Sequence, residues 1–224
     1  MRAAILTCDI IDSSKLKKKE LKLVQQHLQE EFERLHKRFK KDVAYFEIYR
    51  GDGFQGIVVD PVKALKIALW LKSGVKKFTF EKGTISKSTM SLIDFRMAIG
   101  VGEIDGIPKT LKESNGEAFV FSGRTLDGLK SKQQKTSLKT ADDNIDHEFE
   151  VHFKFFDLLT DKWSLAAAEV VYYLLQDLKE VEIAKKIGIS QSAVNSRKKA
   201  SGWEAIAKLL LRYEEIMSKN QDNE

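Results

Sequence analysis

Two runs of strand-forming residues flank a turn sequence that predicts a hairpin early in the chain. The runs are Ala44–Tyr49 and Phe54–Asp60, and Gly51-Asp52-Gly53 stands between them. An Asp-Gly pair readily adopts the positive φ angles that tight hairpin turns need. An earlier apolar run, Ala3–Cys8, ends at Asp9 and predicts a buried strand. The sequence therefore predicts a sheet in which one carboxylate ends a strand and another occupies a neighbouring turn.

Strand and helix signals alternate through the first 130 residues. Apolar residues three and four apart, from Leu21 to Phe39, predict a long amphipathic helix that starts near Asp12-Ser13-Ser14. Asp60-Pro61 is a cap followed by a proline, which opens a second helix. The order strand–helix–strand–strand–helix–strand–helix predicts an α/β (α+β) domain. Its later elements are expected at Val62–Val75, Ile93–Gly102 and Glu117–Lys130, with a polar connection at Phe78–Ser91.

The chain after residue 130 divides into a polar stretch and a helical region. Residues 131–146 are polar and charged throughout, which we interpret as a linker. Phe149, Val151, Phe153 and Phe155 alternate with polar residues, which favours a strand and leaves a helix as the alternative. From Trp163 onward the pattern is helical. We therefore predict a palm domain at residues 1–140 and a linker with an all-α, DNA-binding domain at residues 141–224.

A helix-turn-helix pattern lies at residues 182–195. Ala184 is the small residue at the helix crossing, Gly188 is the glycine of the turn, and Val194 anchors the second helix. Gln and Asn suit adenine edges, Arg suits guanine or phosphate, and Ser and Lys suit phosphate. The alternative is a small helical bundle whose lysines form a solvated face. The candidate DNA-binding residues are Gln191, Ser192, Asn195, Arg197, Lys198 and Lys199.

Asp9 and Asp52 also indicate a phosphoryl-transfer type of site. Two carboxylates on rigid strands are the minimal holder of the divalent metal, Mg²⁺ or Mn²⁺, that neutralises a triphosphate. The turn that follows Asp9 enters a helix N-terminus, where backbone N–H groups can cradle phosphates. The alternative is that both aspartates only make local hydrogen bonds, as such residues commonly do in turns. The candidate nucleotide-binding residues are Ser13, Ser14, Arg50 and Arg124.

These motifs resemble the class III nucleotidyl cyclase catalytic domain, a ferredoxin-like palm. The matching segments are Asp9-Ile10, Gly51-Asp52, Arg96–Gly102 and Gly116–Arg124. The resemblance implies metal ligation by Asp9, Asp52 and the backbone of Ile10, and a transition-state role for Arg124 if the palm is catalytic. With the terminal helix-turn-helix, the chain looks like the SatD-like family over about residues 3 to 213. Class III cyclases share their sites across a dimer, so the resemblance also implies a homodimer.

Several positions depart from the cyclase pattern. Val120 stands where active cyclases place the asparagine that orients the ribose, and Glu117 replaces an aspartate. Asp12 replaces the glycine of the phosphate-cradling turn, which puts a negative charge near a triphosphate. No lysine stands near Ile48 or Tyr49, where the family carries its base-selecting lysine. These departures favour a palm that binds a ligand over an ordinary cyclase.

The composition indicates where in the cell the protein is expected. The chain has 224 residues, of which 42% are hydrophobic and 32% charged, with a net charge of +5. No apolar run approaches the ~18 residues of a membrane helix, and no signal peptide is recognisable. A single cysteine, Cys8, suits a reducing cytosol. We therefore predict a cytoplasmic protein without a membrane partner.

Three functional hypotheses follow. The first is a DNA-binding regulator, acting on double-stranded DNA as a homodimer, whose palm binds a nucleotide or a metal ligand. The second is an active enzyme that makes a cyclic or oligomeric nucleotide with Asp9, Asp52 and Arg124. The third is an adaptor whose palm only dimerises. Salt-dependent duplex binding separates the first hypothesis from the third, and metal-dependent turnover separates the second from both.

Overall fold

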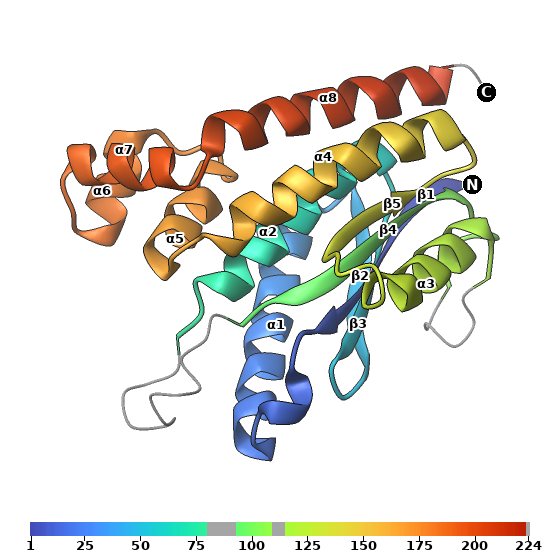
Figure 1. Cartoon of the computed structure of the whole chain (residues 1–224), viewed down its shortest axis with the longest axis horizontal. Coiled ribbons are helices and arrows are strands. Elements are labelled where there is room, and N and C mark those ends of the chain that lie inside the picture. Colours follow the sequence, from blue (N-terminus) through green and yellow to red (C-terminus); the bar gives the residue numbers. More distant parts are fainter. Residues whose placement is uncertain (80–92, 109–114, 223–224) are drawn as a thin grey trace.

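The computed structural model describes residues 1–79, 93–108 and 115–222, which build a mixed α/β fold around one five-stranded sheet (Figure 1). The strands are β1 (Arg2–Ile10), β2 (Val43–Arg50), β3 (Gly53–Val58), β4 (Phe95–Glu103) and β5 (Thr136–Lys139). Their order across the sheet is β2-β3-β1-β4-β5. Only β5 is parallel to its neighbour, β4. The α/β class predicted from the sequence is confirmed.

The residues of β1 alternate between two packed faces. Ala4, Leu6 and Cys8 join the large core with α1 (Lys18–Arg38) and α2 (Ala64–Lys76). On the other face, Ala3 and Ile5 pack with α3 (Glu117–Leu129). Both faces of a central strand are therefore buried, as expected of a sheet with helices on both sides.

Gly100 sets how closely α3 approaches the sheet. A Cβ atom on this β4 residue would lie 2.5 Å from the backbone nitrogen of Ser122 and would also collide with the carbonyl oxygen of Ala118. Beside it, the hydroxyl of Thr7 donates to the hydroxyl of Ser122 over 2.8 Å. A larger residue than glycine would push α3 away and break this contact.

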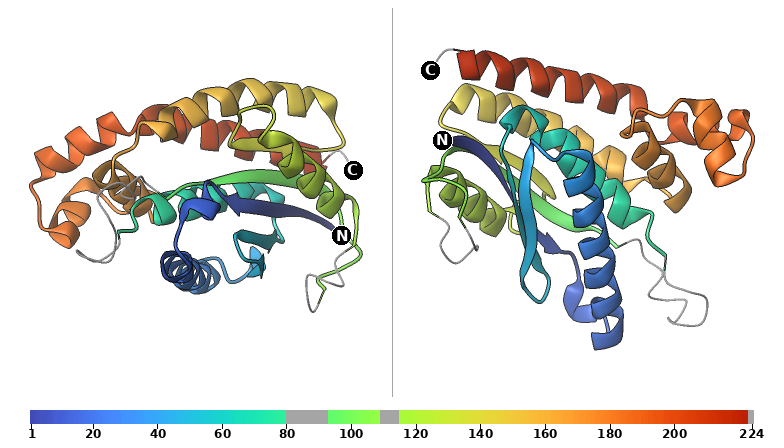
Figure 2. Two further views of the ribbon diagram at one scale, coloured as in Figure 1. Left: turned by 60° about the horizontal axis from the view of Figure 1, so that its bottom comes forward. Right: turned by 180° about the vertical axis from the view of Figure 1, so that it is seen from behind.

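The C-terminal helices are α4 (Asp143–Asp161), α5 (Leu165–Leu174), α6 (Glu180–Ile187), α7 (Gln191–Ala200) and α8 (Trp203–Asp222). Helices α4 and α8 lie side by side, whereas α6 and α7 lie at the end of the molecule away from α3 (Figures 1 and 2). Phe149, Phe153 and Tyr213 belong to the same core as the sheet. The hydroxyl of Tyr213 also donates to the carbonyl oxygen of Pro61 over 3.1 Å.

The predicted linker at residues 131–146 is wrong, because β5 and the start of α4 lie within it. Thr136 and Leu138 are buried, and Thr136 pairs with Met97 of β4. The predicted boundary at residues 140 and 141 falls between β5 and α4. Helices α4 and α8 lie beyond this boundary but share the core of the sheet. The division of the chain into two domains stays a prediction.

Two further expectations needed correction. The favoured strand at Phe149–Phe155 is wrong, because this segment is part of α4; Phe149 and Phe153 face the core while Val151 and Phe155 are exposed. The first long helix starts at Lys18, since Ser13–Lys15 form only a 3₁₀ turn. Most of the predicted connection at Phe78–Ser91 lies outside the described residues.

Candidate functional site

The sheet brings Asp9 and Asp52 to neighbouring backbone positions, as the sequence predicts. Asp9 pairs with Gly53 in the register of β1 and β3. The backbone N–H of Ile10 donates to the carbonyl oxygen of Asp52 over 3.0 Å. The end of β1 and the tip of the hairpin therefore form one rigid corner of the sheet.

The carboxylate of Asp9 is held by Arg96, which lies opposite it on β4. The Nε atom of Arg96 donates to Oδ1 of Asp9 over 2.9 Å, and its Nη2 atom donates to Oδ2. The two side chains are 20% and 18% exposed, so this bidentate pair is largely withdrawn from solvent. Such a fork geometry satisfies both carboxylate oxygens at once.

The carboxylate of Asp52 has a different partner, the hydroxyl of Ser13, which donates to Oδ2 over 2.6 Å. Ser13 follows Asp12, whose φ angle of 56° is left-handed, the conformation that a glycine takes most easily. The Asp12 carboxylate pairs with Lys15 over 2.8 Å, and this hydrogen bond lowers the pKa of Asp12. Ser14 is exposed beside this pair.

Arg96 supplies the positive charge at this corner. Its hydrogen bond with Asp9 raises the pKa of the guanidinium, and the charges of Asp12 and Asp52 add to the effect. A divalent cation held by Asp9, Asp52 and the backbone of Ile10 would have to displace this guanidinium. Within the described ranges, no three or more Asp, Glu, His or Cys residues gather to hold a metal. In this arrangement Arg96 competes with Mg²⁺ or Mn²⁺ for the carboxylate of Asp9.

A cavity of about 480 Å³ lies next to this corner, between the sheet and α3. Gln55 donates to the hydroxyl of Thr7 over 2.6 Å and forms part of the polar wall. Arg50 also lines this cavity, and its guanidinium lies 5.2 Å from the ring centre of Tyr49. Of the predicted nucleotide-binding residues, Arg50 is thus the one that lines this sheet-face cavity.

Arg124 does not lie with Asp9 and Asp52. It is exposed on α3 and lines a second cavity, which is bounded by α3, β5 and α4. Val120, one turn earlier, is 44% exposed on the same helix. Within one copy of the chain, the predicted metal corner and the predicted transition-state arginine therefore belong to separate places.

The C-terminal helices α5, α6 and α7 pack together as a compact three-helix unit. Gly188 ends α6 with a φ angle of 69°, a conformation that glycine adopts without strain. Ser190 caps α7 by accepting the backbone N–H of Ala193. A separate small core, formed by Val170, Ile183, Ala184 and Val194, holds the three helices together. Ala184 and Val194 of the small–glycine–apolar pattern thus lie in this small core, and Gly188 lies at the end of α6.

The polar side chains of α7 fall into two groups. Gln191, Ser192 and Lys199 are exposed, as is Ser196, which the sequence-based prediction did not include. Ser196 could have been found, because it lies two residues, or about 200°, from the buried Val194 on a helix. The exposed face of α7 therefore consists of Gln191, Ser192, Ser196 and Lys199.

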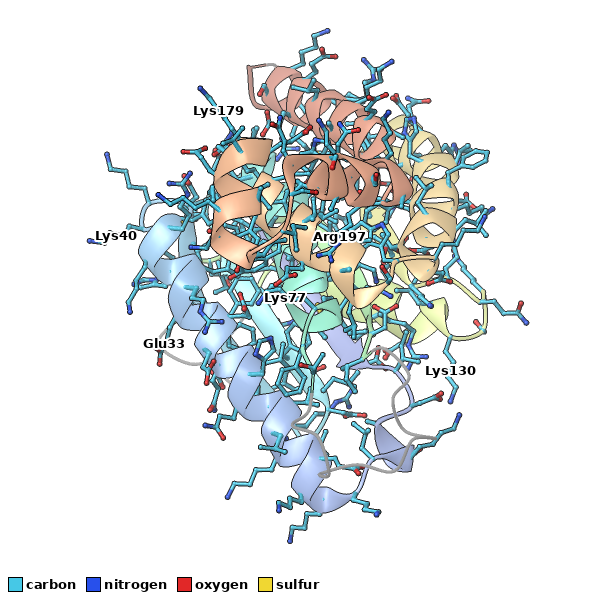
Figure 3. The ribbon with its side chains drawn as sticks, turned by 90° about the vertical axis from the view of Figure 1, so that its left-hand side faces the viewer. Glu33, Lys40, Lys77, Lys130, Lys179 and Arg197 are labelled. Atoms are coloured by element: carbon cyan, nitrogen blue, oxygen red, sulfur yellow. The ribbon has the colours of Figure 1, made fainter. Side chains whose placement is uncertain are left out.

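The remaining α7 candidates contact carboxylates of the neighbouring helices. Lys198 donates to Glu180 over 2.8 Å, and Asn195 lies 3.4 Å from the same carboxylate. The hydrogen bond from Lys198 lowers the pKa of Glu180. Arg197 lies 3.8 Å from Glu169 of α5. Figure 3 looks onto this end of the molecule, where Arg197 is labelled.

Comparisons with known proteins give one family and several structural likenesses. The model of the SatD family matches residues 3–218. No curated protein is similar enough to count as a match. None of the helices in the described part of the chain has the length and apolar character of a membrane span.

The solved structures that the chain is similar to include nucleotidyl cyclase domains. One is the non-canonical dimeric guanylyl cyclase domain of the RhoGC fusion protein from the aquatic fungus Blastocladiella emersonii. It is 19% identical, with 56% of this chain and 73% of that chain covered and a TM-score of 0.43. Another is a bacterial light-regulated adenylyl cyclase, at 14% identity, with 61% and 74% covered and a TM-score of 0.44.

Proposed function

The chain belongs to the SatD family, and we propose that it is a DNA-binding regulator whose palm binds a small ligand. In this proposal α7 enters the major groove of double-stranded DNA in the cytoplasm. The observation that carries the proposal is the exposed polar face of α7, held on a three-helix core of its own. A homodimer would present two such helices to paired half-sites.

The exposed face of α7 suits a nucleic acid in both shape and chemistry. Gln191 can pair with a base edge, while Ser192 and Ser196 are short enough to let the helix approach the groove floor. Lys199 adds a cation at the end of the same face, and Lys185 and Lys186 are exposed on α6. These lysines would neutralise backbone phosphates, which dominate the affinity of DNA-binding proteins.

Arg197 and Lys198 would have a different part in binding. In the unbound protein, Arg197 lies against Glu169 of α5 and Lys198 against Glu180 of α6. Each salt bridge leaves the cation partly exposed, so it can turn to a phosphate at little cost. Loss of either side chain is expected to weaken DNA binding through the loss of its positive charge.

The palm has no catalytic part in this proposal. The chemistry of a cyclase needs free carboxylates for its metal ions, and Asp9 is already held by Arg96. The palm would instead bind a ligand and join two copies of the chain. Turnover of nucleoside triphosphates by the purified protein, abolished by Asp52→Asn, would replace this view with the enzyme hypothesis.

The test of DNA binding is a fluorescence-anisotropy titration of a labelled duplex at several salt concentrations. We expect the affinity to fall as salt rises, with a slope that Lys199→Ala reduces by about 0.9, the share of one phosphate contact. Ser196→Glu should weaken binding further, because it places a negative charge against the groove. The matched control is Lys219→Ala, which removes an exposed lysine at the far end of α8.

Two results would contradict the proposal. One is an absence of salt-dependent duplex binding by the intact chain. The other is equal binding by the wild type and by both α7 variants, which would move the DNA contact elsewhere and leave α7 as part of a helical bundle.

A further inference from the structure

The cavity between α3, β5 and α4 has the size of a small-molecule site. Its volume is about 400 Å³, within the range of ligand pockets. Arg124 comes from α3, Lys132 from the turn before β5, and His147 from α4. Three separate elements thus direct nitrogen-bearing side chains to one opening, which we call the Arg124 cavity.

Two of the cations that line this cavity, Arg124 and Lys132, are not neutralised by ion pairs among the described residues. In the ranges that the structure describes, neither Arg124 nor Lys132 forms an ion pair with a carboxylate. The third lysine, Lys139, is different, because it donates to Asp143 over 2.9 Å and to Asp146 over 2.6 Å. An incoming anion would therefore meet two cations that are in no ion pair with a carboxylate of the described residues.

Glu150 also lines the cavity, and its negative charge would oppose the binding of an anion. Its carboxylate accepts a hydrogen bond from Lys154 over 3.0 Å, which is the main cause of its lowered pKa. The charges of Lys132 and His147 lower the pKa further. Glu150 is thus already compensated by Lys154.

The turn that presents Lys132 has a specific backbone shape. Gln133 adopts a φ of 53°, a left-handed conformation that is unfavourable for a residue with a side chain. The N–H of Gln134 donates to the carbonyl oxygen of Leu129 over 3.1 Å and closes the turn. Strained backbone of this kind often accompanies ligand sites.

The other walls are apolar and hydroxylic. The ring of Phe121 lies 5.8 Å from the ammonium group of Lys139, and Leu129 and Leu138 line the cavity beside it. Thr125 and Ser137 add hydroxyl groups. A ligand with a phosphate at one end and a flat ring at the other would meet both kinds of wall.

We propose that the Arg124 cavity binds a phosphate-bearing small molecule of the nucleotide class. Arg124 and Lys132 would hold the phosphate, since a guanidinium fork suits phosphate oxygens. This inference rests on the ligand-binding part of the proposed function and names its site, which lies away from the Asp9–Asp52 corner.

The test is a titration of the intact protein with ATP, GTP or inorganic pyrophosphate in the presence of EDTA. Binding is followed by calorimetry and by the NMR signals of the imidazole ring of His147, assigned with His147→Gln. We expect saturable binding that shifts this ring. Arg124→Gln and Lys132→Gln should each weaken the affinity about tenfold or more, the usual effect of losing a hydrogen bond to a charged group.

Two variants discriminate the possible locations. Lys162→Gln, a matched control at the other end of α4, should bind like the wild type. Arg50→Gln should also leave the affinity unchanged, because Arg50 lines the sheet-face cavity instead. Loss of binding in Arg50→Gln with normal binding in Arg124→Gln would overturn the inference.

An absence of saturable binding with all three probes would also overturn it. Pyrophosphate binding as tight as that of ATP would show that only the phosphate is recognised. That result would overturn the assignment to the nucleotide class, in which the base contacts the apolar wall beside Phe121. The DNA titration is run without these probes, so its result does not depend on binding at the Arg124 cavity. A protein that binds duplex DNA but none of the probes refutes only this inference, whereas the reverse result refutes the proposed function.

Discussion

The Tyr172→Phe substitution tests how firmly the three-helix unit of α5, α6 and α7 is joined to the palm. The hydroxyl of Tyr172 on α5 donates to the carboxylate of Glu31 on α1 over 2.8 Å. Glu31 is fully buried, and the indole N–H of Trp70 on α2 donates to the same oxygen over 3.1 Å. One carboxylate thus joins three helices, two of them from the palm.

The expected cost follows from this geometry. A buried hydrogen bond to a charged group contributes about 1.5–3 kcal/mol, so Tyr172→Phe should lower the free energy of unfolding by about 2 kcal/mol. For a chain of this size that corresponds to a fall in Tm of roughly 4–8 °C. The matched control is Tyr173→Phe on the same helix, whose side chain is more exposed. That substitution should change the stability by less than about 0.5 kcal/mol.

The assay is urea unfolding followed by tryptophan fluorescence and by circular dichroism. We expect one transition with both probes, shifted to lower urea in Tyr172→Phe. A double-mutant cycle with Glu31→Gln should recover most of the loss as a coupling energy. An unchanged midpoint, or two transitions of which only one moves, would refute the reasoning. The second result would show that the chain unfolds as two units.

Two further predictions concern charged groups of the palm. Burial raises the pKa of Asp94, but Lys72 and other nearby lysines outweigh this and hold the pKa well below its usual range. The ionised carboxylate therefore stabilises the fold above pH ~4, and the stability advantage of the wild type over Asp94→Asn in urea unfolding should shrink as the pH falls below that value. Arg96→Met should free Asp9 and increase Mn²⁺ binding measured by electron paramagnetic resonance; tight binding by the wild type would contradict the assignment of Arg96 as the resident cation.

The parts of the fold that could be predicted are those that depend on short sequence patterns. The hairpin at Gly51–Gly53 and the turn at Gly188 depend on residues next to one another in the chain, so the sequence records them directly. No short sequence pattern of this kind indicates strand β5. It has only four residues, and its position depends on pairing with β4 and on the Asp157 carboxylate of α4, which accepts the N–H of Thr136 over 3.1 Å.

The contacts of the candidate site residues could not be predicted from short sequence patterns either. The sequence places Asp9 at the end of a strand and Arg96 in another strand, but only the antiparallel register makes them partners. In the same way, the position of Arg124 within its helix can be read from the sequence. The neighbours that give it a cavity come from β5, which lies in the predicted linker at residues 131–146, and from α4, of which only the start lies there. Contacts between distant segments therefore decided what the candidate residues can do.

Helix α4 connects the two places where we propose that ligands bind. Its first turns carry Asp146 and His147, which line the Arg124 cavity, and Phe153 packs in the shared core. The indole N–H of Trp163, just beyond its end, donates over 2.8 Å to the carbonyl oxygen of Ser201, the residue that follows α7. A phosphate held by Arg124 and Lys132 would lie beside the start of this helix. A shift of α4 that also moves Trp163 and Ser201 would reach the end of α7, and a change in DNA affinity on addition of the phosphate probe is the expected sign of that connection.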